Sequence, residues 1–335
     1  MSKVKSMFVG IDHGTTAMRF AALFPDGKVL KLELPRTEAA GMSESQLISS
    51  MENAFGINSS DISLMAVTYS MGDGIKDIEN IATVENRGVK SIEGAGKKTG
   101  GGGLVFDSIL SSKIPAVVIP GIHENSDTDP RLNIFSHSTS PEKIGIAYHA
   151  FALGFSDFVL SDISSNTVTV AVANGKLIGA IDACIFAPGL QHGPLDVQAL
   201  RDVDAGRISA NEAFVNSGVL KHTSFSDRHE LIKAAKDGNS QAVLAIDSIA
   251  LFAAMEIAGM QLLMKDYGSE GEVVIEGSVG EVPEVVKKIE SHLGIKVHVL
   301  DRWSAAIGCA EIARDIHLGS SEILGLKVNF TYESE

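Results

Sequence analysis

One order of strands and turns occurs twice in this chain, and it restricts the possible folds more than any other feature. In the first copy an apolar strand ends at Asp12, a polar turn and a second strand follow, and the Asp-Gly pair at 26–27 leads into a third strand. In the second copy Asp162 takes the place of Asp12, and the Asn-Gly pair at 174–175 marks the hairpin. Both dipeptides are typical of tight hairpin turns. A duplicated unit of this length predicts two similar domains rather than a solenoid of short repeats.

The segments after each set of strands alternate between helical and strand patterns, so we expect an α/β fold. A chain of 335 residues is long enough for two domains of ordinary size. We predict an N-terminal domain over residues 1–153 and a C-terminal domain over residues 154–314. Residues 315–335 are expected to return to the N-terminal domain.

The overall charge argues against two classes of partner. The formal net charge is −14, whereas nucleic acid and anionic lipid both attract proteins with an excess of Lys and Arg. We therefore predict no nucleic-acid and no membrane partner. The two cysteines, Cys184 and Cys309, form no C-x-x-C pair, which makes a disulfide framework, a zinc ribbon or an iron–sulfur cluster improbable.

The apolar segments do not resemble targeting or membrane segments. Asp12 interrupts the N-terminal apolar stretch before it reaches the length of a signal peptide. The apolar segment 249–264 contains Glu256 and is expected to be a buried helix. A cytoplasmic location is the prediction.

The first polar turn, His13-Gly14-Thr15-Thr16, is the first candidate site. A carboxylate at the end of a strand, here Asp12, can hold Mg²⁺ through water. Gly14, Thr15 and Thr16 can bring backbone N–H groups and hydroxyls to phosphate oxygens. An ordinary hairpin with an Asp in its turn would show the same pattern.

The second polar turn offers a matching set of groups. Asp162 can supply a second acidic group toward a metal–phosphate. Ser164, Ser165, Asn166 and Thr167 can donate hydrogen bonds to phosphate, although a plain polar turn has a similar composition. The equivalent placement of Asp12 and Asp162, 150 residues apart, favours function for both turns.

Two later segments complete the pattern. Gly277, Ser278 and Gly280 follow an apolar strand, where glycine allows the backbone to approach a flat group such as adenine or ribose. A plain strand-to-helix turn is the alternative. The helix 304–313 is rich in small residues, which predicts close packing against another helix.

These four segments, in this order, resemble phosphate 1, phosphate 2, adenosine and connect 2 of the acetate and sugar kinase/Hsp70/actin superfamily. The resemblance spans nearly the whole chain. It implies duplicated actin-like ATPase domains of the ribonuclease H-like type, with an interdomain cleft for nucleotide. It also implies ATP and Mg²⁺ as cofactors, with Asp12 and Asp162 at the metal.

The middle of the chain is similar to butyrate kinases. Arg131 to His137 resembles their Arg-x-x-x-Ile-Phe-His region, which implies that Arg131 and His137 bind a small carboxylate or stabilise the transferred phosphoryl group. A loop His without such a role is the alternative. Butyrate and acetate kinases carry His-Leu-Gly-Gly-Gly at the second phosphate turn. In this chain Ser164, Ser165 and Asn166 stand in place of the three glycines. A homodimer is implied by the same resemblance.

As a whole, the sequence is identified as a member of the methanogenesis marker protein 12 family, UPF0285. The residues that carry this resemblance are Val-Gly-Ile-Asp-His-Gly-Thr-Thr at 9–16, the glycine-rich stretch 94–103 and Pro-Gly-Ile-His-Glu at 120–124. The stretch 94–103 lacks the spacing of a Walker A loop. The resemblance implies a methanogenic archaeal source and supplies no reaction.

Three hypotheses follow. The first is a Mg–ATP-binding phosphotransferase related to short-chain carboxylate kinases, an ATP-dependent kinase or ATPase. The second is a nucleotide-driven switch that assembles or activates an enzyme of methanogenesis, which the missing glycines favour. The third is a relative that keeps the architecture and binds no nucleotide.

Overall fold

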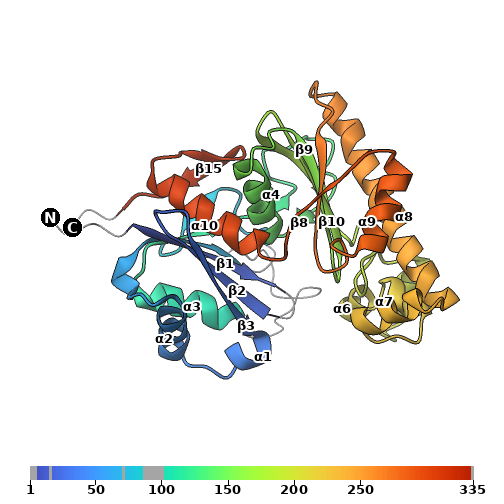
Figure 1. Ribbon diagram of the computed structural model, residues 1–335, viewed down its shortest axis with the longest axis horizontal. Coiled ribbons are helices and arrows are strands. Elements are labelled where there is room, and N and C mark those ends of the chain that lie inside the picture. The colour runs from blue at the N-terminus through green and yellow to red at the C-terminus, as the bar shows by residue number, and fades with distance from the viewer. Residues whose placement is uncertain (1–5, 15–16, 70–71, 86–101, 333–335) are drawn as a thin grey trace. The chain divides into compact units, whose positions relative to one another are not determined.

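The repeated pattern forms the same three-stranded antiparallel meander in both halves of the chain. The computed structural model describes residues 6–14, 17–69, 72–85 and 102–332. These divide into two units. Unit 1 contains the described residues up to 155 and from 303 onward, and unit 2 contains residues 156–302. Figure 1 shows the elements of both.

The described part of unit 1 contains β-strands from both ends of the chain and five α-helices. Its strands are β1 (Met7–His13), β2 (Ala17–Leu23), β3 (Val29–Pro35), β4 (Ile62–Thr68), β5 (Ile78–Asn80), β6 (Ala116–Ile119), β7 (Ile122–His123), β8 (His137–Thr139), β14 (Glu322–Ile323) and β15 (Leu326–Asn329). Its described helices are α1 (Arg36–Ala39), α2 (Glu44–Phe55), α3 (Gly102–Ser112), α4 (Glu142–Ala152) and α10 (Ser304–His317), with a 3-10 turn η1 (Ser59–Asp61).

Unit 2 has a simpler sheet and a longer helical region. Its strands are β9 (Phe158–Ile163), β10 (Thr167–Ala173), β11 (Lys176–Ile181), β12 (Glu272–Glu276) and β13 (His298–Val299). Its helices are α5 (Val197–Asp204), α6 (Ala210–Val215), α7 (Arg228–Lys236), α8 (Ser240–Lys265) and α9 (Pro283–Leu293), with a 3-10 turn η2 (Val219–His222).

The two sheets share one topology, which confirms the duplication. The sheet of unit 1 contains the run β3-β2-β1-β4-β6, and the sheet of unit 2 has the order β11-β10-β9-β12-β13. In each run the three strands of the meander are antiparallel to their neighbours within it. The remaining two strands, β4 and β6 in unit 1 and β12 and β13 in unit 2, run parallel to β1 and β9 respectively. Unit 1 extends its sheet with β5, β15 and β14, of which β14 and β15 come from the C-terminal part of the chain.

Local sequence signals explain where several elements begin and end. Ser43 and Gln46 form a capping box at the start of α2, and Gly56 ends that helix with a φ of 65°. Asn174 and Gly175 have φ values of 53° and 70°, as a type I′ hairpin turn between β10 and β11 requires.

Successive side chains of β1 point to opposite faces of the sheet. Val9 and Ile11 are buried in a core with residues of α2 and α3. Phe8 and Gly10 point to the opposite face, where Phe8 packs against His317 of α10. A Cβ at Gly10 would collide with the backbone of α10 at Ala306, so only glycine allows this approach. Asp12 shares the face of Phe8 and Gly10.

Helices α4 and α10 cover that face and cross closely (Figure 1). A Cβ at Gly308 of α10 would collide with the carbonyl oxygen of Gly145 on α4. The predicted close packing of the small-residue helix is thus confirmed. Because α10 belongs to unit 1, the domain boundary predicted at 314 differs from the observed division, which falls at residue 302. The reason is that α10 packs backbone to backbone against Gly10 of β1 and Gly145 of α4, which both belong to unit 1.

Helix α8 is the one described helix that is long and apolar enough to cross a membrane by length and composition. Half of its most apolar window is buried inside the structure, as a core helix would be. Glu256 on its inner face is 1% exposed. The prediction of a buried helix here is confirmed for that inner face.

Candidate functional site

Asp12 lies at the second-last position of β1 and is 3% exposed. It faces Arg19 across the β1–β2 hairpin, and the Arg19 guanidinium donates to Asp12 Oδ2 at 3.2 Å. Arg19 also donates to Glu33 of β3 at 3.0 Å. The other carboxylate oxygen, Oδ1, is buried and accepts no hydrogen bond in this structure. A buried carboxylate oxygen without a partner marks a place where a ligand or ion can bind.

The surroundings of Asp12 make ionisation of its carboxyl group unfavourable. Burial, reinforced by the negative charge of Glu142, raises its pKa from 3.8 to about 6, although Arg19 and Lys143 act in the opposite direction. Near pH 7 the carboxylate is ionised at the cost of folding free energy. A cation at Oδ1 would remove that cost.

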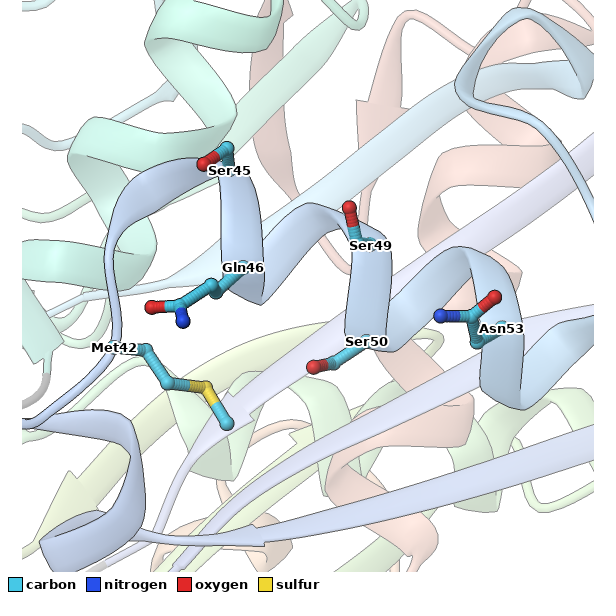
Figure 2. A pocket seen from close by; sticks show the side chains of 6 residues that line it. All are labelled: Met42, Ser45, Gln46, Ser49, Ser50 and Asn53. Atoms are coloured by element: carbon cyan, nitrogen blue, oxygen red, sulfur yellow. The ribbon is translucent and has the colours of Figure 1, made fainter.

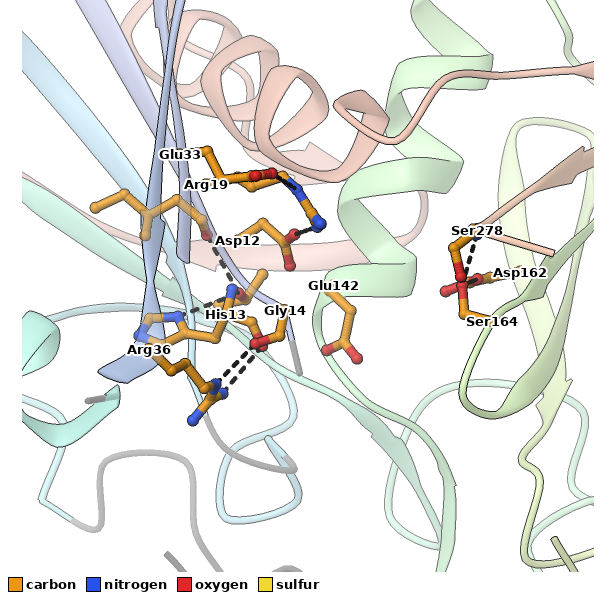
Figure 3. A network of polar contacts seen from close by, with 12 residues as sticks. Asp12, His13, Gly14, Arg19, Glu33, Arg36, Glu142, Asp162, Ser164 and Ser278 are labelled. Atoms are coloured by element: carbon orange, nitrogen blue, oxygen red, sulfur yellow. Dashed lines mark hydrogen bonds and ion pairs between the residues drawn. The ribbon is translucent and has the colours of Figure 1, made fainter. Parts of the chain in front are cut away.

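Glu142 and Lys143, at the start of α4, complete this group of charges, and sequence reasoning missed both. Glu142 accepts from Ser140 Oγ at 2.6 Å and from Lys143 Nζ at 3.1 Å. Lys143 is 4% exposed. The face of β1 that Asp12 shares is the face covered by α4, which explains why residues so distant in sequence act on its pKa. Figure 3 shows Glu142 on the side of the Asp12 carboxylate.

The first polar turn is held from outside by Arg36 of α1. Its guanidinium donates to Gly14 O at 2.8 Å and to His13 O at 3.3 Å (Figure 3). Thr68 of β4 holds the same turn from the neighbouring strand, since its hydroxyl accepts from His13 N at 3.1 Å. Gly14 is required here, because a Cβ would lie 2.8 Å from Ala17 O. The predicted Thr15 and Thr16 lie outside the described residues.

In unit 2 the structure brings four predicted residues together. Asp162 is the second-last residue of β9, the position equivalent to Asp12 in β1. Its Oδ1 accepts from Ser164 Oγ at 2.8 Å, and Ser164 Oγ accepts from Ser278 N at 3.0 Å (Figure 3). Gly277 has a φ of 101°, and a Cβ there would collide with Asp162 Oδ1. The second polar turn and the predicted adenosine segment therefore form one cluster.

The rest of the second turn is fixed by the chain around residues 189–192. Ser165 O accepts from Gln191 N and His192 N, at 3.0 and 2.8 Å. Gly189 packs against the backbone of Asn166 so closely that a Cβ would not fit. Thr167 is 0% exposed, and its hydroxyl donates to Pro188 O at 3.0 Å. Thr167 thus fastens this loop to β10, a structural role that differs from the predicted contact with phosphate.

The predicted adenosine segment is hydrogen-bonded both to the end of β9 and to helix α7. Val279 N and Gly280 N both donate to Ile163 O at 2.9 Å. Arg228 of α7 donates to Ser278 O at 2.5 Å and forms an ion pair with Glu281. Arg228 was not among the predicted site residues. Its position at the start of a helix offered no sequence signal.

Arg131 has a local partner that competes with its predicted role. Arg131 forms a bidentate ion pair with Asp129. Its Nε donates to Oδ1 at 2.9 Å and its Nη2 donates to Oδ2 at 2.7 Å. This local partner already balances the guanidinium charge, and the Arg131 side chain is 59% exposed. His137 begins β8 and lies opposite His123 of β7. The role of both at an acceptor site stays a prediction.

A hollow elsewhere on unit 1 carries none of this chemistry. It lies along α2, and its lining side chains point to one side of the helix (Figure 2). The lining residues are Met42, Ser45, Gln46, Ser49, Ser50 and Asn53. All six are uncharged, so the hollow lacks a carboxylate that could hold Mg²⁺.

The donor set suits Mg²⁺ delivered with a nucleotide rather than a metal held by protein alone. Among the described residues there is no group of three or more His, Cys, Asp or Glu side chains arranged to hold a metal. Mg²⁺ in phosphate-binding enzymes keeps several waters and takes only one or two carboxylates, with phosphate oxygens as the other ligands. The unpartnered Oδ1 of Asp12, with Glu142 acting on the same carboxylate, fits that role.

Comparison with solved structures identifies the fold. A propionate kinase from Francisella tularensis aligns with a TM-score of 0.64 at 14% identity, over 92% of this chain and 99% of that chain. An acetate kinase from Porphyromonas gingivalis gives 0.59 at 15% identity, over 93% and 99%. A ROK family glucokinase from Streptomyces griseus, in complex with glucose and AMPPNP, gives 0.52 at 15% identity, over 92% and 99%. The fold is the duplicated actin-like ATPase fold.

Sequence comparison identifies the family. The chain belongs to the UPF0285 family, and it is 61% identical over 323 residues to the UPF0285 protein of Methanosarcina acetivorans, covering 96% of this chain and 99% of that protein. The UPF0285 protein of Methanocaldococcus jannaschii is 44% identical over 332 residues, with the same coverage. No family model matches the sequence. The predicted family membership is confirmed.

Proposed function

We propose that this protein binds Mg–ATP and is a phosphotransferase related to short-chain carboxylate kinases. The observation that carries the proposal is Asp12, a buried carboxylate with one unpartnered oxygen beside a glycine-containing turn. An actin-like ATPase fold places such a strand end and turn in each unit, and here both carry an Asp at the same strand position.

Each residue has a defined part in this proposal. Asp12 Oδ1 would hold Mg²⁺, directly or through water, and Glu142 would add negative charge at the same place. Gly14 would allow the turn to approach phosphate, with Arg36 fixing its carbonyl groups. Bound Mg²⁺ would neutralise charge on the phosphate oxygens.

Unit 2 contributes the second turn and the adenosine segment. Asp162 and Ser164 would face the phosphates, with Ser165 and Asn166 in the turn that the 189–192 loop holds rigid. Gly277, Ser278 and Gly280 would approach the base or ribose. Positioning and charge neutralisation are the main requirements of phosphoryl transfer, and this set would supply both.

One observation favours a second candidate function, a nucleotide-driven switch that assembles or activates another enzyme. Ser164 Oγ covers one oxygen of Asp162 at 2.8 Å, at a turn where carboxylate kinases have glycines. A carboxylate whose oxygen accepts from its own turn is less available to orient an attacking group. Such a site suits nucleotide binding with slow turnover.

Turnover assays separate the two candidates. ADP formation from Mg–ATP is measured alone and with acetate, propionate or butyrate, on wild type and on Asp12→Asn. Asp237→Asn, which removes an exposed carboxylate of unit 2, is the matched control. A kinase shows carboxylate-stimulated turnover that Asp12→Asn abolishes and Asp237→Asn retains. Slow turnover that no carboxylate stimulates supports the switch, and stimulation that survives Asp12→Asn contradicts the role of Asp12.

A further inference from the structure

Helix α8 of unit 2 carries an apolar stripe on its outer face. Four of its large side chains are unusually exposed: Leu244 (65%), Leu251 (42%), Met255 (49%) and Leu262 (67%). Together with two small residues between them they form the α8 stripe, which consists of Leu244, Ser248, Leu251, Met255, Ala258 and Leu262. The stripe spans about 27 Å at 1.5 Å per residue. Exposed apolar surface of this extent marks an interaction site.

The inner face of the same helix explains why the stripe is left outside. Glu256 is hydrogen-bonded to Thr169 Oγ1 at 2.6 Å and accepts from Ala187 N at 3.2 Å, and it is 1% exposed. Ile249 and Ile257 are 0% exposed on that side. These contacts fix the rotation of α8, so Leu251 and Met255 cannot turn inward.

Hollows lie on both sides of the first half of the stripe. One of about 310 Å³ is lined by Leu244 and by the aromatic residues Phe186 and Phe252. The other, of about 410 Å³, is lined by Leu244 and Leu251 together with His292 of α9. Protruding leucines next to hollows of side-chain size are the features that interdigitating helices need.

We propose that the α8 stripe is a homodimer interface, on which a second copy of this chain packs its own α8 in antiparallel orientation. The order of sizes along the stripe reads large, small, large, large, small, large in both directions. A two-fold axis opposite residue 253 therefore sets Leu244 against Leu262 of the second copy. It also sets Leu251 against Met255, and Ser248 against Ala258. A self-complementary patch is what a two-fold interface requires.

The charges near the stripe favour a second copy over a lipid surface. The stripe itself carries no charge. Beside it, Asp247 forms an ion pair with Lys288 of α9, and Lys265 and Asp266 follow at the helix end. Helices that lie on membranes carry Lys and Arg beside the apolar face, whereas this chain has a net charge of −14.

The test is the mass of the full chain in solution, by light scattering after size exclusion and by sedimentation equilibrium. Wild type is expected at twice 35.4 kDa. Leu251→Glu places two unpaired carboxylates in the interface and should weaken dimerisation on the order of 100-fold. Leu318→Glu is the matched control, because Leu318 is 73% exposed and belongs to unit 1, whereas α8 belongs to unit 2. It should leave the dimer intact.

A charge pair tests the antiparallel register. Leu244→Lys alone and Leu262→Glu alone should each dissociate the dimer. The double variant sets Lys opposite Glu at both ends of the stripe and should restore it. A monomeric wild type, including one that binds vesicles of anionic lipid, would overturn the proposal. So would a dimer that Leu251→Glu leaves unchanged, or a double variant without recovery while circular dichroism shows intact folding.

Discussion

Asp12 combines a cost to folding with a proposed role in binding. Its folded-state pKa of about 6 lies above the 3.8 of an unfolded chain, so the native state holds more protons between these values. The free energy of unfolding therefore falls as pH rises from about 4 to 6, and the full cost is present above pH 6. Residues kept despite such a cost are typical of functional sites.

Asp12→Asn is expected to stabilise the ligand-free protein above pH 6. The gain should approach about 3 kcal/mol, the equivalent of the pKa shift, and vanish near pH 4. Urea unfolding of both proteins between pH 4 and 8 measures it. A variant that is less stable than wild type at pH 8 would show that the Arg19 ion pair outweighs the cost of burial.

The same carboxyl should make nucleotide affinity depend on pH. Binding of Mg²⁺ needs the ionised form, so the affinity for Mg–AMPPNP should fall about tenfold per pH unit below pH 6. Titrating Asp12→Asn at the same pH values corrects for protonation of the nucleotide. Parallel pH profiles in the two proteins would exclude Asp12 as the titrating group.

Burial also raises the pKa of Glu256, a residue outside the candidate site. Its pKa rises from 4.5 to about 8. The neutral carboxyl can donate to Thr169 Oγ1, which frees the Thr169 hydroxyl to donate to Ser161 Oγ at 2.9 Å. Because the shift is upward, the free energy of unfolding falls as pH rises from about 4.5 to 8.

Glu256→Gln should remove this pH dependence. The amide keeps both hydrogen bonds, since its nitrogen can donate to Thr169 and its oxygen can accept from Ala187 N. We expect a gain on the order of 4 kcal/mol at pH 9 and little change at pH 5. Thermal unfolding at the two pH values measures it, and equal melting shifts at both would contradict the assignment of a neutral Glu256.

At the scale of elements, the crossing of α4 and α10 depends on glycine. Gly308→Ala places a methyl group against Gly145 O, so the two helices must separate. We expect a loss of about 2 kcal/mol or more, despite the higher helix propensity of Ala. Gly41→Ala is the control in the same unit, because its Cβ would lie at an ordinary 3.6 Å from Glu38 O. Equal stability of the two variants in urea would refute the packing argument.

Elements with local signals were predictable. The Asn-Gly pair at 174–175 forms the predicted hairpin turn, and the small-residue segment 304–313 forms a closely packed helix, as predicted. The side chains around Asp12 were predictable only in part. Arg19 could have been found from the register of the β1–β2 hairpin. Glu142 could not, because its position depends on which face of β1 the helix α4 covers.

Long-range packing also decided the errors. The sequence placed residues 304–314 in the second domain because they follow its last strand. Gly10, Gly145 and Gly308 instead let α10 pack in unit 1. The role of Thr167 was missed for a similar reason, since Pro188 O, its partner, is supplied by a loop 21 residues further along.

At the scale of the whole molecule, the proposed nucleotide binding implies that Mg–ATP would stabilise the native state. A ligand at 100 times its dissociation constant adds about 2.7 kcal/mol. Mg–ATP should therefore raise the melting temperature of wild type, and ATP with excess chelator should raise it less. An equal rise in both conditions would count against a bound Mg²⁺.

Isothermal titration calorimetry with Mg–ATP and Mg–AMPPNP, on wild type and Asp12→Asn at pH 7.5, tests the central claim most directly. We predict micromolar binding by wild type. Asp12→Asn should bind about 1–3 kcal/mol more weakly, with its fold retained by circular dichroism. No binding by wild type at millimolar nucleotide would contradict the account, and so would an unchanged affinity of Asp12→Asn.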